Sequence, residues 1–131
     1  MVASDAMPLT SYGRKVVPNA AGTSTRILGQ YVRDEKLLTL SDAIARLSLY
    51  PAQRMESFAP AFAQKGRIKI GADADLVIFD PETVATEASY LEPFKTPSGV
   101  HSVWVAGQLS VQEGRLVEQV GAGKKITSLT R

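Results

Sequence analysis

The segment Leu-Val-Ile-Phe at residues 76–79 is the feature that most constrains how this chain can fold. These four apolar residues follow Asp75 and precede the pair Asp80-Pro81, and the pattern predicts a short strand over residues 75–79. Because the run is apolar at every position, we expect the strand to be covered on both faces. A second candidate strand, residues 67–70, precedes it and is separated from it by a turn at Gly71.

The sequence after this strand is also β-like. Residues 81–99 contain several prolines and glycines and are expected to be an irregular connection. Residues 101–117 then alternate apolar stretches with turn residues, which predicts strand, turn, strand, turn and strand. Gly107 and Gly114 lie where tight hairpins need positive φ. The second half of the chain is therefore predicted to be a small antiparallel sheet.

The first half is predicted to be helical after a long loop. Proline and glycine interrupt residues 1–25, and residues 25–34 have apolar side chains at helical spacing. A clearer helix follows, with Ser41 as the expected N-terminal cap and Pro51 as the residue that ends or kinks it. Pro51 also suits the start of a second short helix, residues 51–55. Residues 56–66 are expected to form a connector.

Composition narrows the class of protein. The chain has 131 residues, no cysteine and a net charge of +2, so disulfides and thiolate metal sites are excluded and a basic nucleic-acid surface is not indicated. No apolar run approaches about 18 residues, so we expect no membrane span. The N-terminus does not have the pattern of a signal peptide. These features predict a cytoplasmic globular protein without nucleic-acid or membrane partners.

The residues taken alone do not assemble a catalytic site. His101 is the single histidine, and next to a predicted strand it is expected to be a surface or packing residue. The tail sequence Gly-Ala-Gly-Lys-Lys does not satisfy a phosphate-loop pattern, and Asp73 and Asp75 are not followed by the ligands of a calcium loop. Asp5, in Val-Ala-Ser-Asp-Ala-Met-Pro, would by itself be read as a loop or capping residue.

Longer sequence patterns resemble those of a known protein family. Residues 65–81 and 99–117 resemble the C-terminal end of metal-dependent amidohydrolases, in which a Gly-x-x-Ala-Asp-Leu-Val-x-Phe-Asp strand precedes a Val-x-Val-x-Gly hairpin. Residues 38–55 resemble the helix that comes before this strand in the family. Residues 22–44, 50–68 and 88–107 are similar to the N-acyl-D-amino-acid deacylases, also called D-aminoacylases. The resemblance covers about residues 2–117.

This resemblance implies a fold class and domain boundaries. The chain is expected to be an α/β protein, the C-terminal fragment of a (β/α)8 amidohydrolase barrel plus most of a small composite β-sandwich domain. Residues 1–62 would be the end of the barrel, with its last strand, a long active-site loop and helices. Residues 63–120 would be the C-terminal part of the sandwich and residues 121–131 a tail. Met1 is then expected to lie inside a barrel strand, so that a longer protein precedes it.

The resemblance also implies residue roles. Asp5 matches the aspartate that follows the last barrel strand, at the mouth where barrel enzymes carry out their chemistry. In the family this carboxylate lies at the zinc site, takes a proton from the zinc-activated water and passes it to the leaving amine. Asp5 is therefore the expected catalytic residue and a candidate metal ligand. The other zinc ligands of the family lie upstream, so this chain alone is expected to bind no zinc.

One motif departs from the family. D-aminoacylases carry His-Pro-Arg before Gly-Thr, and the arginine is placed to bind the substrate carboxylate. Here the matching residues are Val17, Pro18 and Asn19, and asparagine cannot supply a bidentate cation. Asn19 is thus the matching substrate-binding position, with Arg14 and Arg26 as candidate replacements for the missing arginine.

The expected function is therefore that of a zinc-dependent amidohydrolase acting on a linear amide bond, that of N-acyl-D-amino acids, with the isolated chain inactive. Two alternatives remain. The chain could be a non-catalytic β-domain module, or it could be one subunit of a split amidohydrolase whose partner supplies the histidines. Uncovered apolar faces on residues 76–79 and on the helix of Ile44 would indicate a missing partner, either the N-terminal part or a second copy.

Overall fold

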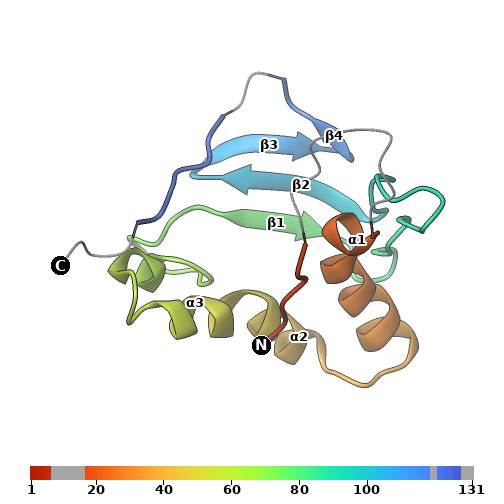
Figure 1. Cartoon of the computed structure of the whole chain (residues 1–131), viewed down its shortest axis with the longest axis horizontal. Helices are drawn as coiled ribbons and strands as arrows, with labels where there is room; N and C mark the ends of the chain where they lie inside the picture. The colour runs from red at the N-terminus through yellow and green to blue at the C-terminus, as the bar shows by residue number, and fades with distance from the viewer. Residues whose placement is uncertain (7–16, 119–120, 128–131) are drawn as a thin grey trace. The chain divides into compact units, whose positions relative to one another are not determined.

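The computed structural model of the chain describes residues 1–6, 17–118 and 121–127 (Figure 1). These residues form two compact units that interleave along the sequence. The helix unit contains Ala3–Ala43 and Phe79–Val100, without the undescribed residues, and the sheet unit contains Met1–Val2, Ile44–Ile78 and the described residues from His101 onward. The boundaries at residues 62 and 120, which follow from the family resemblance, stay a prediction for a longer protein.

The sheet unit carries most of a four-stranded sheet, whose order is β1-β2-β3-β4. Its strands are β1 (Leu76–Phe79), β2 (Val100–Val105), β3 (Gln108–Gln112) and β4 (Arg115–Leu116). The β2–β3 and β3–β4 pairs are antiparallel hairpins with two-residue loops, Ala106-Gly107 and Glu113-Gly114. All four loop residues have positive φ, between 48° and 78°, as a type I′ turn requires. The order of strand, turn, strand, turn and strand predicted for residues 101–117 is confirmed.

The prediction that β1 is covered on both faces is wrong. β1 is an edge strand, and Val77 and Ile78, which point to opposite faces, are 56% and 55% exposed. The predicted strand at residues 67–70 is also absent, and Ile68 and Ile70 are exposed. A strand needs a hydrogen-bonded neighbour, whereas this segment closes a turn in which Ala72 N–H bonds the Lys69 carbonyl.

One continuous helical stretch contains α2 (Leu40–Ile44), η2 (Ala45–Leu49) and α3 (Tyr50–Met55), and η3 (Pro60–Gln64) follows it. The predicted cap Ser41 is wrong, because the Asp42 N–H is accepted by Thr39 Oγ1 at 3.2 Å. Pro51 neither ends the stretch nor lies outside it. Because proline has no N–H to donate to the carbonyl four residues earlier, the helix widens into the π-helical turns of η2 before it. The short second helix predicted from Pro51 is confirmed as α3.

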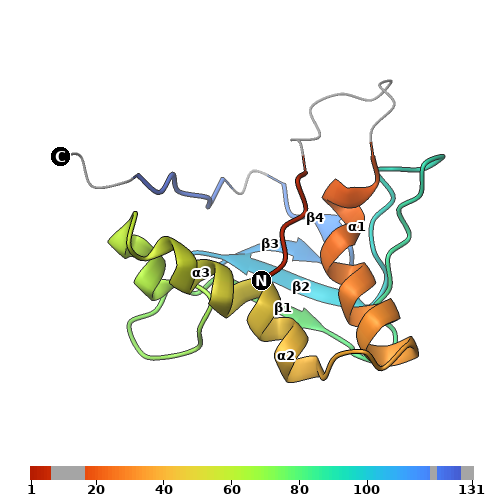
Figure 2. The same cartoon turned by 60° about the horizontal axis from the view of Figure 1, so that its bottom comes forward.

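The first helix begins earlier than the sequence pattern predicts. It runs from α1 (Asn19–Arg26) into the π-helical η1 (Ile27–Asp34), so it starts at Asn19 instead of Thr25 (Figure 2). Gly22 and Gly29 lie two turns apart on one face. A Cβ at Gly22 would lie 2.4 Å from Thr86 Oγ1, and one at Gly29 would lie 2.5 Å from the Val84 carbonyl oxygen. The two glycines therefore let segment 84–88 approach the helix backbone.

Val84 is the centre of the helix unit's core. It is 1% exposed, and its carbonyl accepts a 2.6 Å hydrogen bond from the Arg33 guanidinium. Its backbone also lies against Gly99, whose φ is +70°. Around it the connection 79–100 is irregular, as predicted, with one isolated bridge between Ala85 and Ser98. A turn at its start is closed by the Asp80 carboxylate, which accepts from Glu82 N–H and the Thr83 hydroxyl.

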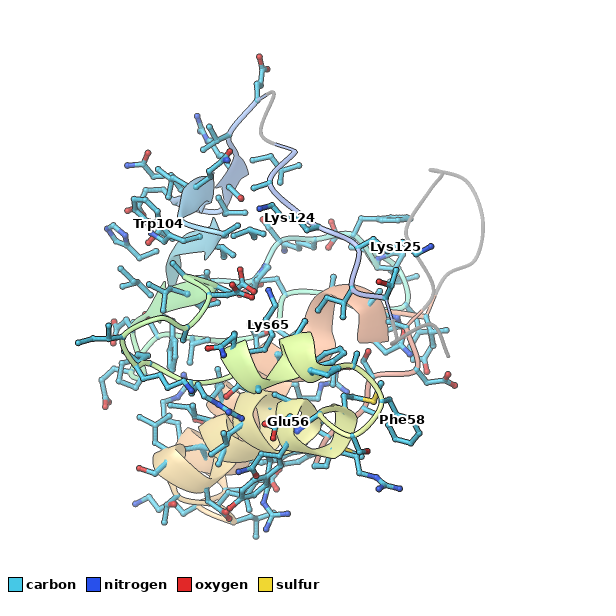
Figure 3. The ribbon with its side chains drawn as sticks, turned by 90° about the vertical axis from the view of Figure 1, so that its left-hand side faces the viewer. Glu56, Phe58, Lys65, Trp104, Lys124 and Lys125 are labelled. Atoms are coloured by element: carbon cyan, nitrogen blue, oxygen red, sulfur yellow. The ribbon has the colours of Figure 1, made fainter. Side chains whose placement is uncertain are left out.

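Lys65 joins the segment after η3 to the first hairpin of the sheet unit. Its ammonium lies 2.9 Å from Asp73 Oδ2 and 2.5 Å from Asp75 Oδ2, and it points from the end of η3 toward the strands (Figure 3). The other Asp75 oxygen accepts Ala106 N–H at 2.8 Å and so supports the β2–β3 turn. These contacts lower the pKa of Asp75, first through the hydrogen bond from Lys65 and then through that from Ala106. The hydrogen bond to Asp75 raises the pKa of Lys65.

Replacing Asp75 by asparagine is expected to lower the free energy of unfolding by about 1 kcal/mol at pH 7, since the group is partly exposed and solvent screens it. A carboxylate whose pKa is lowered by folding stabilises the protein above its ordinary pKa of 3.8, and this contribution is lost as the pH falls through the lower folded value. The difference in the free energy of unfolding between wild type and variant should therefore vanish in strong acid.

Urea unfolding at several pH values measures this difference. The control Asp73→Asn removes a more exposed partner of Lys65, so it should lower the free energy of unfolding less. An equal difference at every pH would contradict the prediction.

Candidate active site

The segment that carries Asp5 is not part of a strand. Residues 1–6 have no regular secondary structure, which differs from the barrel strand expected there, and Val2 N–H bonds the Arg46 carbonyl within the sheet unit. The described residues supply no neighbouring strand to pair with this segment. Asp5 is exposed and has a φ of +50°, in the left-handed region that aspartate tolerates better than most residues.

Asn19 holds the Asp5 segment within the helix unit. It is the first residue of α1, and its side-chain amide donates to the Ser4 carbonyl at 2.7 Å and, at 3.4 Å, to the Asp5 carbonyl. In addition, the Thr23 hydroxyl donates to the Asn19 carbonyl at 2.8 Å, which fixes the first turn of the helix. Asn19, which the family resemblance matches to a substrate-binding arginine, thus binds backbone carbonyls instead.

A pocket of about 310 Å³ opens beside Asn19. α1 supplies one wall and segment 88–90 supplies the other, and these walls meet because Gly22 allows Thr86 to approach the helix. Arg26, two turns after Asn19, is the charged side chain among the described residues of the lining. The lining consists of Val17, Pro18, Asn19, Gly22, Thr23, Arg26, Ala88, Ser89 and Tyr90.

The structure therefore brings together some of the predicted site residues. Asn19 and Arg26 share the pocket, and Asn19 contacts the backbone of Asp5. Arg14 lies outside the described residues. Ser89 and Tyr90 were missed by sequence reasoning, because they lie in an irregular segment some 70 residues away from α1. The closest signal was the pair of helix glycines seven residues apart, which marks a face that another backbone approaches.

The described residues do not fit a zinc site on their own. No group of three or more histidine, cysteine, aspartate or glutamate side chains in the described part of the chain could hold a metal ion. Zinc sites in proteins need three or four such ligands, and Asp5 could supply one at most. His101 confirms its expected surface role, since its Nε2 lies 2.8 Å from Glu113 Oε1 and both side chains are largely exposed.

Comparison with known proteins agrees with these features. Residues 1–111 match the model of the family described as "Amidohydrolase family". The chain belongs to this family. It is 37% identical over 107 residues to an N-acyl-D-glutamate deacylase and 36% identical over 113 residues to a D-aminoacylase, both from Alcaligenes xylosoxydans xylosoxydans. These alignments cover 82% and 86% of this chain but 20% and 22% of the relatives, so this amidohydrolase chain spans about a fifth of their length.

Solved structures place the fold in the same family. A D-aminoacylase with a binuclear metal centre superposes with a TM-score of 0.78 at 33% identity, covering 86% of this chain and 23% of that one. An N-acyl-D-glutamate deacylase from Bordetella bronchiseptica, complexed with zinc and a phosphonate inhibitor, gives 0.66 at 40% identity and covers 72% and 19%. The amidohydrolase chain is thus an α/β piece with an antiparallel sheet that matches part of these enzymes. Among the described residues, no helix is long and apolar enough to cross a membrane.

Proposed function

We propose that this chain is the C-terminal portion of an amidohydrolase that cleaves the amide bond of N-acyl-D-amino acids. The observation that carries the proposal is that one side chain, Asn19, links the backbone of Asp5 to the wall of the Arg26 pocket. A proton-transferring carboxylate and a carboxylate-binding cation on one small unit are what hydrolysis of an N-acyl amino acid requires. The deacylase relatives support this substrate class.

Asp5 moves the proton in this proposal. As water adds to the amide carbonyl, a C–O bond forms and the Asp5 carboxylate accepts the water's proton. When the C–N bond breaks, Asp5 returns that proton to the leaving nitrogen, which gives a carboxylic acid and a free amino acid. Asp5 suits this role because it is exposed. Zinc held by residues outside this chain would supply Lewis-acid activation of the water and the carbonyl.

Arg26 binds the α-carboxylate of the substrate. The pocket lining contains no acidic side chain among its described residues, so the guanidinium is available to an anion. Ser89 and Tyr90 offer hydroxyl groups at the opposite wall. A guanidinium can bind a carboxylate through two parallel hydrogen bonds, whereas asparagine at the family's usual position cannot. The substrate-binding cation has therefore moved two helical turns along α1.

The sheet unit is built to contact a further part of the protein. Its buried apolar residues among those described are the alanines 52, 59 and 122, which are too small to make a large core. β1 leaves one edge unpaired and Val77 and Ile78 half exposed, and Ile44 is exposed as well. Since the relatives are about five times longer, we propose that the missing N-terminal part adds strands to the β1 edge. A split amidohydrolase with a separate N-terminal subunit would use the same surface.

The test replaces the matching C-terminal segment of the Alcaligenes D-aminoacylase by this chain, and the product is called the hybrid enzyme below. With zinc, the hybrid enzyme is expected to hydrolyse N-acetyl-D-amino acids, and the 131-residue chain alone is expected to have no activity. A zinc-loaded, folded hybrid enzyme without turnover would refute the proposed function. Turnover by the chain alone would instead refute the dependence on a missing part.

Replacing Arg26 by alanine is expected to raise the KM of the hybrid enzyme for N-acetyl-D-amino acids about 10- to 100-fold, the effect of losing a charge-assisted hydrogen bond. Arg26→Lys keeps the charge but not the planar fork, so its KM should lie between the two. An N-acetylated amine without a carboxylate is the control substrate, and its turnover should be the same with all three enzymes. An unchanged KM in Arg26→Ala would show that another group binds the carboxylate.

A further inference from the structure

Among the described residues, one neighbouring side chain, that of Asn19, holds the backbone at Asp5, and none holds its carboxylate. Asn19 Nδ2 carries two N–H groups, and they reach the carbonyls of Ser4 and Asp5, which lie on either side of the Asp5 Cα. These contacts therefore act on both peptide groups that flank Asp5. Within the described part of the chain, no hydrogen bond or ion pair engages the Asp5 carboxylate, which is left open to solvent.

The conformation held in this way is one that needs support. Left-handed backbone costs a residue with a Cβ about 1 kcal/mol or more, although aspartate tolerates it better than most residues. Asp5 adopts it at a φ of +50° in a segment without secondary structure. A donor that bonds the carbonyls before and after the residue favours this geometry over the extended alternative, in which successive carbonyls point in opposite directions.

The support is itself rigid. Asn19 is half-buried at the first turn of α1, where the Thr23 hydroxyl bonds its carbonyl, and one turn later Gly22 is in close contact with Thr86. The side chain thus extends from a packed helix to a segment without regular secondary structure. Asparagine, which is shorter than an arginine, makes these contacts from the wall of the pocket.

We propose that Asn19 is a positioning residue, which fixes the left-handed backbone at Asp5 so that its free carboxylate projects in one direction beside the pocket. The inference rests on the proposed function for the role of Asp5, but the conformational effect belongs to this chain alone. Unlike the arginine that the family resemblance implies at this position, Asn19 does not contact the substrate. It orients the proton-transferring group instead.

The experiment compares Asn19→Asp with the wild type in the 131-residue chain, by NMR. The variant has nearly the same shape but places carboxylate oxygens against two carbonyl oxygens. The Cα and Cβ chemical shifts of Asp5 should therefore move from left-handed toward random-coil values. An acidic residue in the first turn of a helix is favourable, so the unfolding midpoint should stay the same or rise. If Asn19 had a merely structural role, its replacement would lower the unfolding midpoint. A change in the Asp5 backbone conformation at an unchanged midpoint therefore indicates a positioning role.

Ala20→Asp is the matched control, because it places the same charge in the same turn and keeps Asn19. Its Asp5 shifts should equal those of the wild type. Asn19→Ala serves as a second variant if Asn19→Asp does not fold, and it should release Asp5 in the same way. Wild-type Asp5 shifts in a folded Asn19 variant, or equal changes in Ala20→Asp, would overturn the proposal.

The hybrid enzyme supplies a kinetic readout. Asn19→Asp should lower kcat about 10- to 100-fold, as expected for a misplaced catalytic group, and leave KM unchanged. A higher KM with unchanged kcat would show that Asn19 contacts substrate and would overturn the positioning role. Failure of the proposed function can be distinguished from failure of the positioning role. An inactive hybrid enzyme would refute the proposed function, whereas the chemical shifts of Asp5 would still test the positioning role.

Discussion

Replacing Asp5 by asparagine is expected to lower kcat of the hybrid enzyme by about 10²- to 10⁴-fold, the usual contribution of a positioned general acid–base group. Asparagine has the same shape as aspartate and also tolerates the φ of +50°, so the backbone and its bonds to Asn19 should persist. The variant therefore removes the proposed proton acceptor and little else. Because we propose that Arg26 binds the substrate carboxylate, KM should change far less than kcat.

The measurement is steady-state hydrolysis of an N-acetyl-D-amino acid by zinc-loaded hybrid enzyme. Glu92→Gln is the matched control, since Glu92 is an exposed carboxylate of the same unit whose ammonium partner, Lys95, lies 3.8 Å away. It should keep wild-type kcat. A loss smaller than tenfold in Asp5→Asn would assign the proton transfer to another group and would remove Asp5 from the catalytic residues. A zinc content reduced in that variant would indicate that Asp5 also acts as a metal ligand.

The sheet could be predicted from the sequence because its signals are local. Gly107 and Gly114 follow Ala106 and Glu113 at two-residue loops, and the flanking residues alternate in a way that only a tight hairpin accommodates. The first helix was predicted six residues short. Its opening turn, Asn-Ala-Ala-Gly-Thr-Ser, has no apolar stripe, because its buried face is a glycine that meets Thr86. A helix face that packs through a glycine, and not through apolar side chains, produces no hydrophobic periodicity in the sequence.

The candidate site could likewise be predicted only in part, because its tertiary contacts leave no local signal in the sequence. Asp5 and Asn19 were identified by matching positions in a family, and their mutual hydrogen bonds have no signature in either segment. Ser89 and Tyr90 reach the pocket because of backbone packing around Val84, which is a tertiary effect. The errors at residues 67–70 and at β1 have a shared cause as well. Ile68, Ile70, Val77 and Ile78 are all exposed, so within the described residues these apolar side chains have nothing that covers them.

The packing around Val84 allows a sharp test in the helix unit. Replacing Gly99 by alanine is expected to lower the free energy of unfolding by about 2–4 kcal/mol, from left-handed strain plus overpacking. Gly99 has a φ of +70°, and a Cβ there would lie 2.4 Å from the Val84 nitrogen and 2.5 Å from its Cα. Both neighbours are backbone atoms of a buried residue, and they cannot rotate away as a side chain could.

Gly71→Ala separates the two causes of this loss. Gly71 has a similar φ of +82°, but a Cβ added there would meet no atom within 4 Å. This variant should therefore cost only the conformational strain, about 1 kcal/mol. Urea unfolding of both variants gives the comparison, and the additional loss in Gly99→Ala measures the close approach to Val84. If the two variants lost equal stability, the Gly99 backbone would not be packed against Val84. The walls of the Arg26 pocket, which depend on that core, would then need another support.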